Sequence, residues 1–150
     1  MTDAEAILRT AKIILVIDWP SRDVPDGLAV AGYTVFVKGG PGPGSYSVVE
    51  VIHGQVVTRP AANPPSSVDL VYAHRPISEL YGIIALASRL RATAVWRQSG
   101  LAPTGVKDPK GCWVTAEESN DARRMVEAGG LRFVDDAYIT DVACSLEPPQ

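Results

Sequence analysis

Residues 13–17 read Ile13-Ile14-Leu15-Val16-Ile17, an apolar run that ends at Asp18 and a turn containing Trp19-Pro20. Consecutive apolar, mostly β-branched residues favour a strand buried on both faces, because a half-exposed strand would alternate apolar with polar residues. The run therefore predicts the first strand of a sheet that is covered on both sides.

Strand and helix patterns alternate along the rest of the chain. The clearest helix pattern follows Pro76, where Leu80, Ile83, Ile84, Ala87 and Leu90 recur at helical spacing. Capping boxes, Thr2 with Glu5 and Thr115 with Glu118, predict two further helix starts. The expected strands cover residues 13–17, 33–37, 68–73, 93–97 and 131–134, and the expected helices cover about 2–11, 24–31, 76–90 and 115–128.

This alternation implies right-handed crossovers between parallel strands. We therefore expect one α/β domain over residues 1–150, with its core over about 11–140. The fold class is a Rossmann-like, doubly wound, mostly parallel sheet of five or six strands, with helices on both faces.

Three segments interrupt the pattern. Residues 48–52 and 55–58 flank His53-Gly54 and predict either a hairpin or one bulged strand. Residues 38–45 contain Gly-Gly-Pro-Gly-Pro-Gly, which predicts a loop. Residues 98–114 form a longer segment broken by Gly and Pro, and a loop of that length in a compact domain is often functional.

Composition excludes several classes of function. The net charge is −3, and the 14 Lys+Arg residues are scattered among 17 Asp+Glu residues. No basic stripe indicates a nucleic-acid partner. No apolar run is long enough to span a membrane, and the acidic N-terminus lacks the cationic start of a secretory signal, so we expect a cytoplasmic protein. Cys112 and Cys144 lie far apart without a CxxC pair, and we expect no metal site.

The strand ends carry the candidate site. In an open doubly wound sheet, ligands bind outside the carboxyl ends of the strands, where the strand order reverses. Asp135 and Asp136 are adjacent, and adjacent strand residues point to opposite faces, so we do not expect them to form a carboxylate pair. We expect them instead to cap a short terminal helix. The candidate segments are 18–22, 38–40, 74–76, 98–100 and 135–136.

Each candidate side chain has a functional and a structural interpretation. Ser21 and Arg22 are expected either to bind a phosphate or to form part of a solvated turn. Lys38 predicts a point charge on a phosphate or an ordinary surface lysine. His74 is suited to acid or base chemistry near neutral pH, or to a hydrogen bond at a strand end. Gln98 offers an amide that orients a backbone or ligand group.

Several of these segments together resemble the CoA-binding domain family over about residues 11–140. The shared pieces are the Pro20-Ser21-Arg22 turn, Arg75-Pro76 after a strand, and Val95-Trp96-Arg97-Gln98-Ser99-Gly100, the most specific of them. The resemblance extends to the CoA-binding domains of succinyl-CoA synthetase and acyl-CoA synthetases. It implies CoA or an acyl-CoA as the ligand, a small nucleotide-type molecule, with a homodimer as the assembly to consider. The ligand residues that it implies are Pro20, Ser21, Arg22, Lys38, Arg75, Pro76, Gln98 and Gly100.

The turn after the first strand departs from this family. The family places a Gly/Ser-rich turn there, whose amides meet phosphate oxygens. This chain has Asp18-Trp19, and a carboxylate at that place opposes a pyrophosphate.

We expect a CoA-binding or acyl-CoA-binding protein, nucleotide-binding rather than catalytic. The alternatives are a small enzyme with a remodelled crevice, for which Asp18 and His74 are the catalytic candidates, and an interaction subunit whose ligand pocket has decayed.

Overall fold

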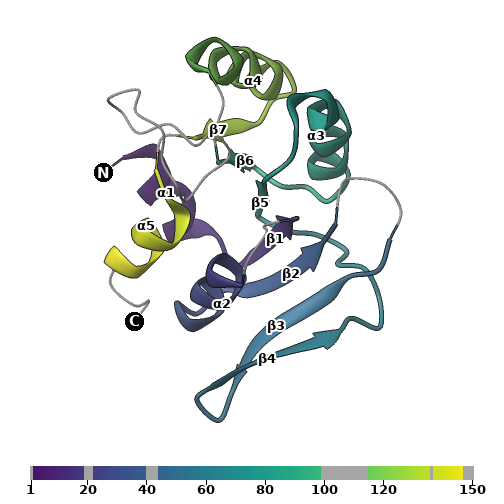
Figure 1. The fold of residues 1–150 in the computed structure, drawn as a ribbon, viewed down its shortest axis with the longest axis vertical. Helices are drawn as coiled ribbons and strands as arrows, with labels where there is room; N and C mark the ends of the chain where they lie inside the picture. The colour runs from purple at the N-terminus through teal and green to yellow at the C-terminus, as the bar shows by residue number, and fades with distance from the viewer. Residues whose placement is uncertain (1, 19–21, 40–43, 99–114, 136, 147–150) are drawn as a thin grey trace.

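The computed structural model describes residues 2–18, 22–39, 44–98, 115–135 and 137–146. Its described strands form one seven-stranded sheet in the order β4-β3-β2-β1-β5-β6-β7 (Figure 1). The pairs β1–β2, β1–β5, β5–β6 and β6–β7 are parallel, whereas β2–β3 and β3–β4 are antiparallel. The strands are β1 (Ile13–Ile17), β2 (Thr34–Lys38), β3 (Ser47–Ile52), β4 (Gln55–Pro60), β5 (Leu70–Ala73), β6 (Ala94–Arg97) and β7 (Arg132–Val134).

The predicted α/β class is confirmed, with seven strands in place of five or six. The difference comes from residues 47–60, which form a true hairpin rather than one bulged strand. His53 and Gly54 both have positive φ, at 52° and 79°. Two successive residues of positive φ match the right-handed twist of the flanking strands in a two-residue hairpin turn.

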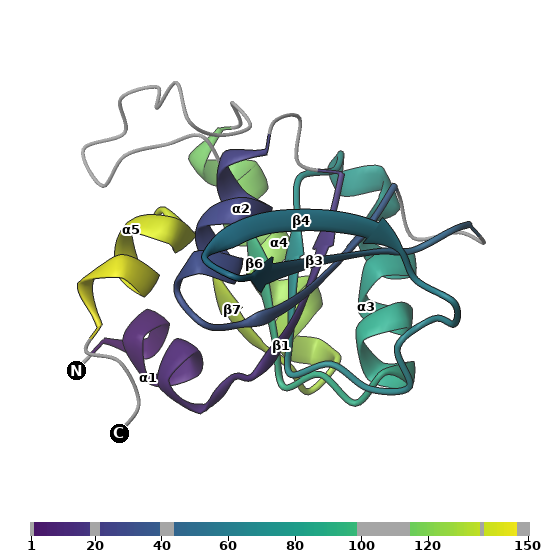
Figure 2. The ribbon, with the colours of Figure 1, turned by 90° about the horizontal axis from the view of Figure 1, so that it is seen from below.

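Helices cover both faces of the sheet (Figure 1, Figure 2). One face packs against α1 (Asp3–Thr10), α2 (Asp23–Val30) and α5 (Ile139–Ser145), and the other against α3 (Leu80–Arg89) and α4 (Ala116–Ala128). Within β1, Ile14 and Val16 face the first group, and Leu15 and Ile17 face the second. The predicted two-sided burial of this strand is therefore confirmed, since all four side chains are fully buried.

Both predicted capping boxes begin helices. The Thr2 hydroxyl accepts the amide of Glu5 at 3.1 Å, and the Thr115 hydroxyl accepts the amide of Glu118 at the same distance. The helix expected from Pro76 starts later: Pro76 is extended, with ψ 152°, and precedes a short 3₁₀ turn, η1 (Ile77–Glu79). The ψ of Pro76 excludes it from an α-helix, and the next three residues form the 3₁₀ turn, so α3 begins only at Leu80.

The terminal helix starts differently from the prediction. The N-cap of α5 is Tyr138, and no side chain caps it. Asp135, expected as a cap, is buried and accepts a hydrogen bond from the Ser119 hydroxyl of α4. Asp136 lies outside the described residues.

Among the residues described, no helix is both long and apolar enough to cross a membrane.

Candidate functional site

The carboxyl ends of three neighbouring strands bring four of the expected residues to one edge of the sheet. Asp18 follows β1, His74 and Arg75 follow β5, and Gln98 follows β6. The ladder continues one step past the strands, since the His74 amide donates to the Ile17 carbonyl at 3.1 Å and the Gln98 amide to the Ala73 carbonyl at 3.3 Å. Since β1 lies between β2 and β5, the strand order reverses here, which is where ligands bind in an open doubly wound sheet.

Asp18 adopts a backbone conformation that glycine favours. Its φ is 54°, and its amide donates to the Lys38 carbonyl at 2.9 Å. Asp is one of the few residues with a side chain that tolerate this region. Its carboxylate forms an ion pair with Arg75. The turn therefore directs the Asp18 carboxylate across the end of the sheet toward β5.

Arg75 places a partly exposed cation at this edge. Its Nε donates to Glu79 Oε2 at 2.7 Å, and its Nη1 donates to the Asp18 carboxylate. The side chain is 28% exposed, so a ligand could reach it. The guanidinium of Arg75 is thus held by two carboxylates, those of Asp18 and Glu79.

His74 is half-buried beside these charges. Burial lowers the pKa of His74, Arg97 and Arg75 lower it further, and Asp18 opposes the shift. The imidazole is therefore shifted toward its neutral form, which can accept a proton.

Gln98 is buried at the end of β6, and the Tyr72 hydroxyl lies 3.4 Å from its Oε1. Burial raises the pKa of Tyr72 far above its ordinary value, so this phenol stays protonated and donates. The first turn of α2 lies on the same face, where the Tyr138 hydroxyl donates to Asp23. Burial, followed by the bond to Asp23, raises the pKa of Tyr138 as well.

Two other expected residues point elsewhere. Arg22, 60% exposed, binds Asp26 within α2 and also donates to Thr58 of β4. Lys38 is 3% exposed with its Nζ 5.5 Å from the centre of the Tyr46 ring, so the interpretation as a surface lysine is wrong. Burial, and then the charge of Arg89, lower the pKa of Lys38. Within the described part of the chain, the partners found for these two side chains are thus other than Asp18 and Arg75, although the Lys38 carbonyl accepts a hydrogen bond from the Asp18 amide.

The remaining expected residues are Pro20, Ser21 and Gly100, which lie outside the described residues, and Pro76, which stands exposed at the start of η1.

Arg97, the last residue of β6, lies beside this site but was not among the site residues expected from the sequence. It is 2% exposed, and its Nη2 lies 3.4 Å from the Arg75 carbonyl and 3.8 Å from Glu118 Oε2. A charged residue that ends an apolar strand, directly before Gln98, is the signal that could have marked it.

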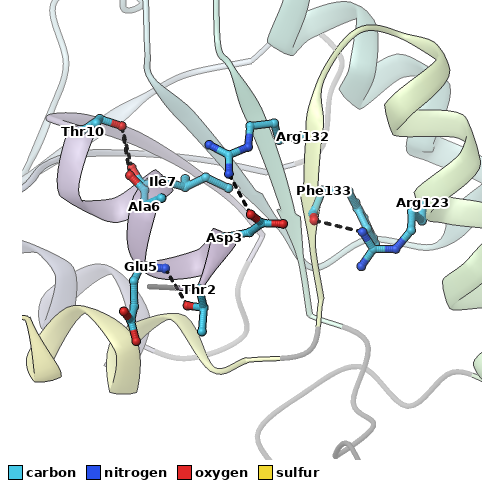
Figure 3. A network of polar contacts seen from close by, with 9 residues as sticks. All are labelled: Thr2, Asp3, Glu5, Ala6, Ile7, Thr10, Arg123, Arg132 and Phe133. Atoms are coloured by element: carbon cyan, nitrogen blue, oxygen red, sulfur yellow. Dashed lines mark hydrogen bonds and ion pairs between the residues drawn. The ribbon is translucent and has the colours of Figure 1, made fainter.

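A cavity of about 370 Å³ lies beside β7. Figure 3 shows the polar contacts around it: Asp3 with Arg132, and Arg123 with the Phe133 carbonyl. Its lining contains none of the expected site residues and consists of Thr2, Asp3, Ala4, Glu5, Arg123, Phe133, Val134, Ala137 and Val142.

Comparison with known proteins gives a family match. The family model described as a CoA binding domain matches residues 18–141. No curated protein matches the chain by sequence.

Two solved structures are similar in fold. The crystal structure of Prb, described as PH1109 protein redesigned for binding, is 17% identical with a TM-score of 0.58, and the match covers 95% of this chain and 89% of that one. The structure of cell-free ID.343 from Thermus thermophilus is 24% identical with a TM-score of 0.54, over 95% and 96% of the two chains. At these identities the likeness shows the fold alone.

Proposed function

Since this chain belongs to the CoA-binding domain family, we propose that it binds CoA or an acyl-CoA without transforming it, at the carboxyl ends of β1, β5 and β6. The observation that carries the proposal is the guanidinium of Arg75, which is partly exposed and held by two carboxylates where the strand order reverses. Arginine pairs with carboxylate and phosphate oxygens by the same charge-assisted hydrogen bonds. The arrangement therefore fits a ligand that carries phosphates.

The residues of this edge divide the work of binding. Arg75 would exchange the Asp18 carboxylate for a phosphate oxygen, while Glu79 keeps the guanidinium oriented through its 2.7 Å bond. Gln98, held by Tyr72, would offer a donor and an acceptor to a neutral part of the ligand. Asp18 competes with the ligand for Arg75, so affinity is lower than the cation alone would provide.

The proposal extends to partners and place. The ligand is a small nucleotide-type molecule, and the net charge of −3, with basic and acidic residues interspersed along the chain, argues against nucleic acid. We place the protein in the cytoplasm, where CoA is available, and a homodimer is its proposed assembly.

A small enzyme is the second candidate, favoured by His74. A half-buried imidazole with a lowered pKa, near a carboxylate, is suited to accept a proton from a substrate or from water. In that reading the same edge binds a thioester or another electrophile, and His74 acts as general base.

Calorimetry with CoA, acetyl-CoA and ADP tests the proposal. We expect the native protein to bind CoA below millimolar concentration and Arg75→Gln to bind it about ten-fold or more weakly, because a charge-assisted contact is lost. Arg59→Gln is the matched control, since Arg59 is ion-paired with Glu50 on the β3–β4 hairpin. Absence of binding to all three ligands would exclude the proposal, and release of CoA from acetyl-CoA that disappears in His74→Gln would establish the enzyme.

A further inference from the structure

The guanidinium of Arg97 is buried with incomplete partners. The side chain is 2% exposed, and among the described residues its Nη2 contacts the Arg75 carbonyl at 3.4 Å and Glu118 Oε2 at 3.8 Å. Both exceed the 2.7–2.9 Å typical of a charge-assisted bond. Nη1 is buried and has no hydrogen-bond partner among the residues that the structure describes.

Such a group needs an explanation because arginine cannot give up its proton inside a protein. A buried lysine can become neutral, whereas Arg97 keeps its charge. Leaving a buried charged donor unpaired costs free energy, and native proteins rarely do so without an ion, water or ligand in that place.

The position of Arg97 suits a ligand group. Side chains alternate along β6: Ala94 and Trp96 face the side of α2, and Val95 faces α3 and α4. Arg97 therefore lies on the side of α3 and α4, and its contact with Glu118 places it at the first turn of α4. The N-terminus of a helix favours negative charge.

Arg97 also lies close to the proposed CoA site. It ends β6, the strand next to β5, whose end carries Arg75, and neighbouring strands are about 5 Å apart. A ligand held by Arg75 could thus place a second anionic group at Arg97.

We propose that Arg97 binds an oxyanion, a phosphate or a carboxylate, of the ligand that occupies the edge formed by β1, β5 and β6. This inference rests on the proposed function for the identity of the ligand, and on the geometry of Arg97 for the anion itself. Phosphates of CoA and a carboxylate at the end of an acyl group share the required chemistry.

The anion is tested first with inorganic phosphate, independently of CoA. Millimolar phosphate, against chloride at equal ionic strength, should raise the thermal midpoint of the native protein and raise that of Arg97→Gln clearly less, because Arg75 is still present in the variant. Arg132→Gln is the matched control, because Arg132 pairs with Asp3 on another part of the surface, and it should respond as the native protein does. The proposal is overturned if phosphate does not shift the native midpoint, or shifts Arg97→Gln equally.

A second variant covers the case in which Arg97→Gln does not fold. Glu118→Gln removes the carboxylate nearest to the guanidinium and leaves Arg97 in place. It should bind phosphate more tightly than the native protein. An equal or weaker response would contradict the proposal.

The source of the oxyanion is then read from dissociation constants of CoA, dephospho-CoA, acetyl-CoA and succinyl-CoA. Arg97→Gln should weaken by about ten-fold every ligand that carries the recognised group. Loss for CoA with dephospho-CoA unaffected identifies the 3′-phosphate, loss for succinyl-CoA alone identifies the acyl carboxylate, and loss for all four identifies the diphosphate. If the native protein binds none of them, the proposed function fails, whereas the phosphate experiment still decides the role of Arg97.

Discussion

Asp18 combines an unfavourable backbone conformation with a favourable ion pair. A φ of 54° suits glycine better than any residue with a side chain, yet the carboxylate gains Arg75 as its partner. The same carboxylate is bound to Arg75, the cation that we propose as the partner of a ligand phosphate. Asp18 is therefore the residue at which stability and ligand affinity are opposed.

Asp18→Gly should raise the affinity for CoA by about three- to ten-fold, close to 1 kcal/mol. Glycine adopts the observed φ without strain, and Arg75 is released from one carboxylate. Calorimetric titration with CoA measures the effect. Asp18→Asn, which removes the charge at nearly constant size, should change affinity in the same direction. Weaker binding in both variants would show that the carboxylate itself contacts the ligand or substrate.

His74 links stability to pH through its burial. Its pKa is lowered in the folded state, whereas an unfolded histidine titrates near about 6.5. Below that value His74 is protonated in the unfolded state before it is protonated in the folded state. The free energy of unfolding therefore decreases as pH falls from about 6.5 toward the folded pKa. Above it, the contribution is fully present.

The free energy of unfolding of the native protein should accordingly decrease between about pH 7.5 and pH 5 more than that of His74→Gln. Urea denaturation at a series of pH values provides the measurement. His53→Asn is the control, because His53 lies in the exposed hairpin turn and Asn tolerates its positive φ. If the free energy of unfolding varied with pH in the same way for the native protein and His74→Gln, His74 would not be the source of the pH dependence.

At the scale of elements, α3 is attached to the sheet by its buried stripe. Leu80, Ile83, Leu86 and Ala87 are buried, while Tyr81 is 72% exposed. Ile84, expected from the sequence to face the core, is only partly buried and packs at its margin. The stripe is narrower than the apolar spacing suggested, because Ile84 lies at the boundary between the core face and the solvent face.

Leu80→Ala should lower the free energy of unfolding by about 2–5 kcal/mol, as is typical when a fully buried leucine is truncated. Tyr81→Ala, the neighbouring exposed position, should change it by less than about 0.5 kcal/mol. Chemical denaturation of both variants makes the comparison. A similar decrease in the free energy of unfolding for the two variants would contradict the packing of Leu80, rather than Tyr81, against the sheet.

At the scale of the molecule, two hydrophobic cores share a single sheet. One lies under α1, α2 and α5, and the other under α3 and α4. Alternate residues of the same strands contribute to both cores. Loss of the packing on one face would therefore expose the strands on which the other core is built. This shared framework supports the expectation of one domain.

A variant that keeps Trp96 as its only tryptophan, Trp19→Phe with Trp113→Phe, tests that expectation. Trp96 is fully buried in the first core, and its indole donates to the Ala137 carbonyl at 3.0 Å. Its fluorescence and the far-ultraviolet circular dichroism should change in one coincident transition. Two separated transitions would indicate that the cores unfold independently.

The sequence alone was sufficient for features whose physics is local. The apolar run at residues 13–17 predicted a buried strand, and the Thr115–Glu118 box predicted the start of α4, because burial pattern and capping depend on neighbouring residues in the chain. It also placed Asp18, His74 and Gln98 among the residues that follow strands, and parallel strands align their carboxyl ends on one side of the sheet.

Tertiary structure alone decided where the charged side chains point. Arg22 turns to Asp26 and Thr58, Lys38 is buried beside Tyr46, and Arg97 is enclosed near Glu118. Each orientation is set by a partner that approaches through space, and a long flexible side chain has many rotamers of similar energy until that partner is in place. The sequence therefore determined the parallel strands and the end of the sheet that bears the candidate site, while packing determined which cations remain for an anionic ligand.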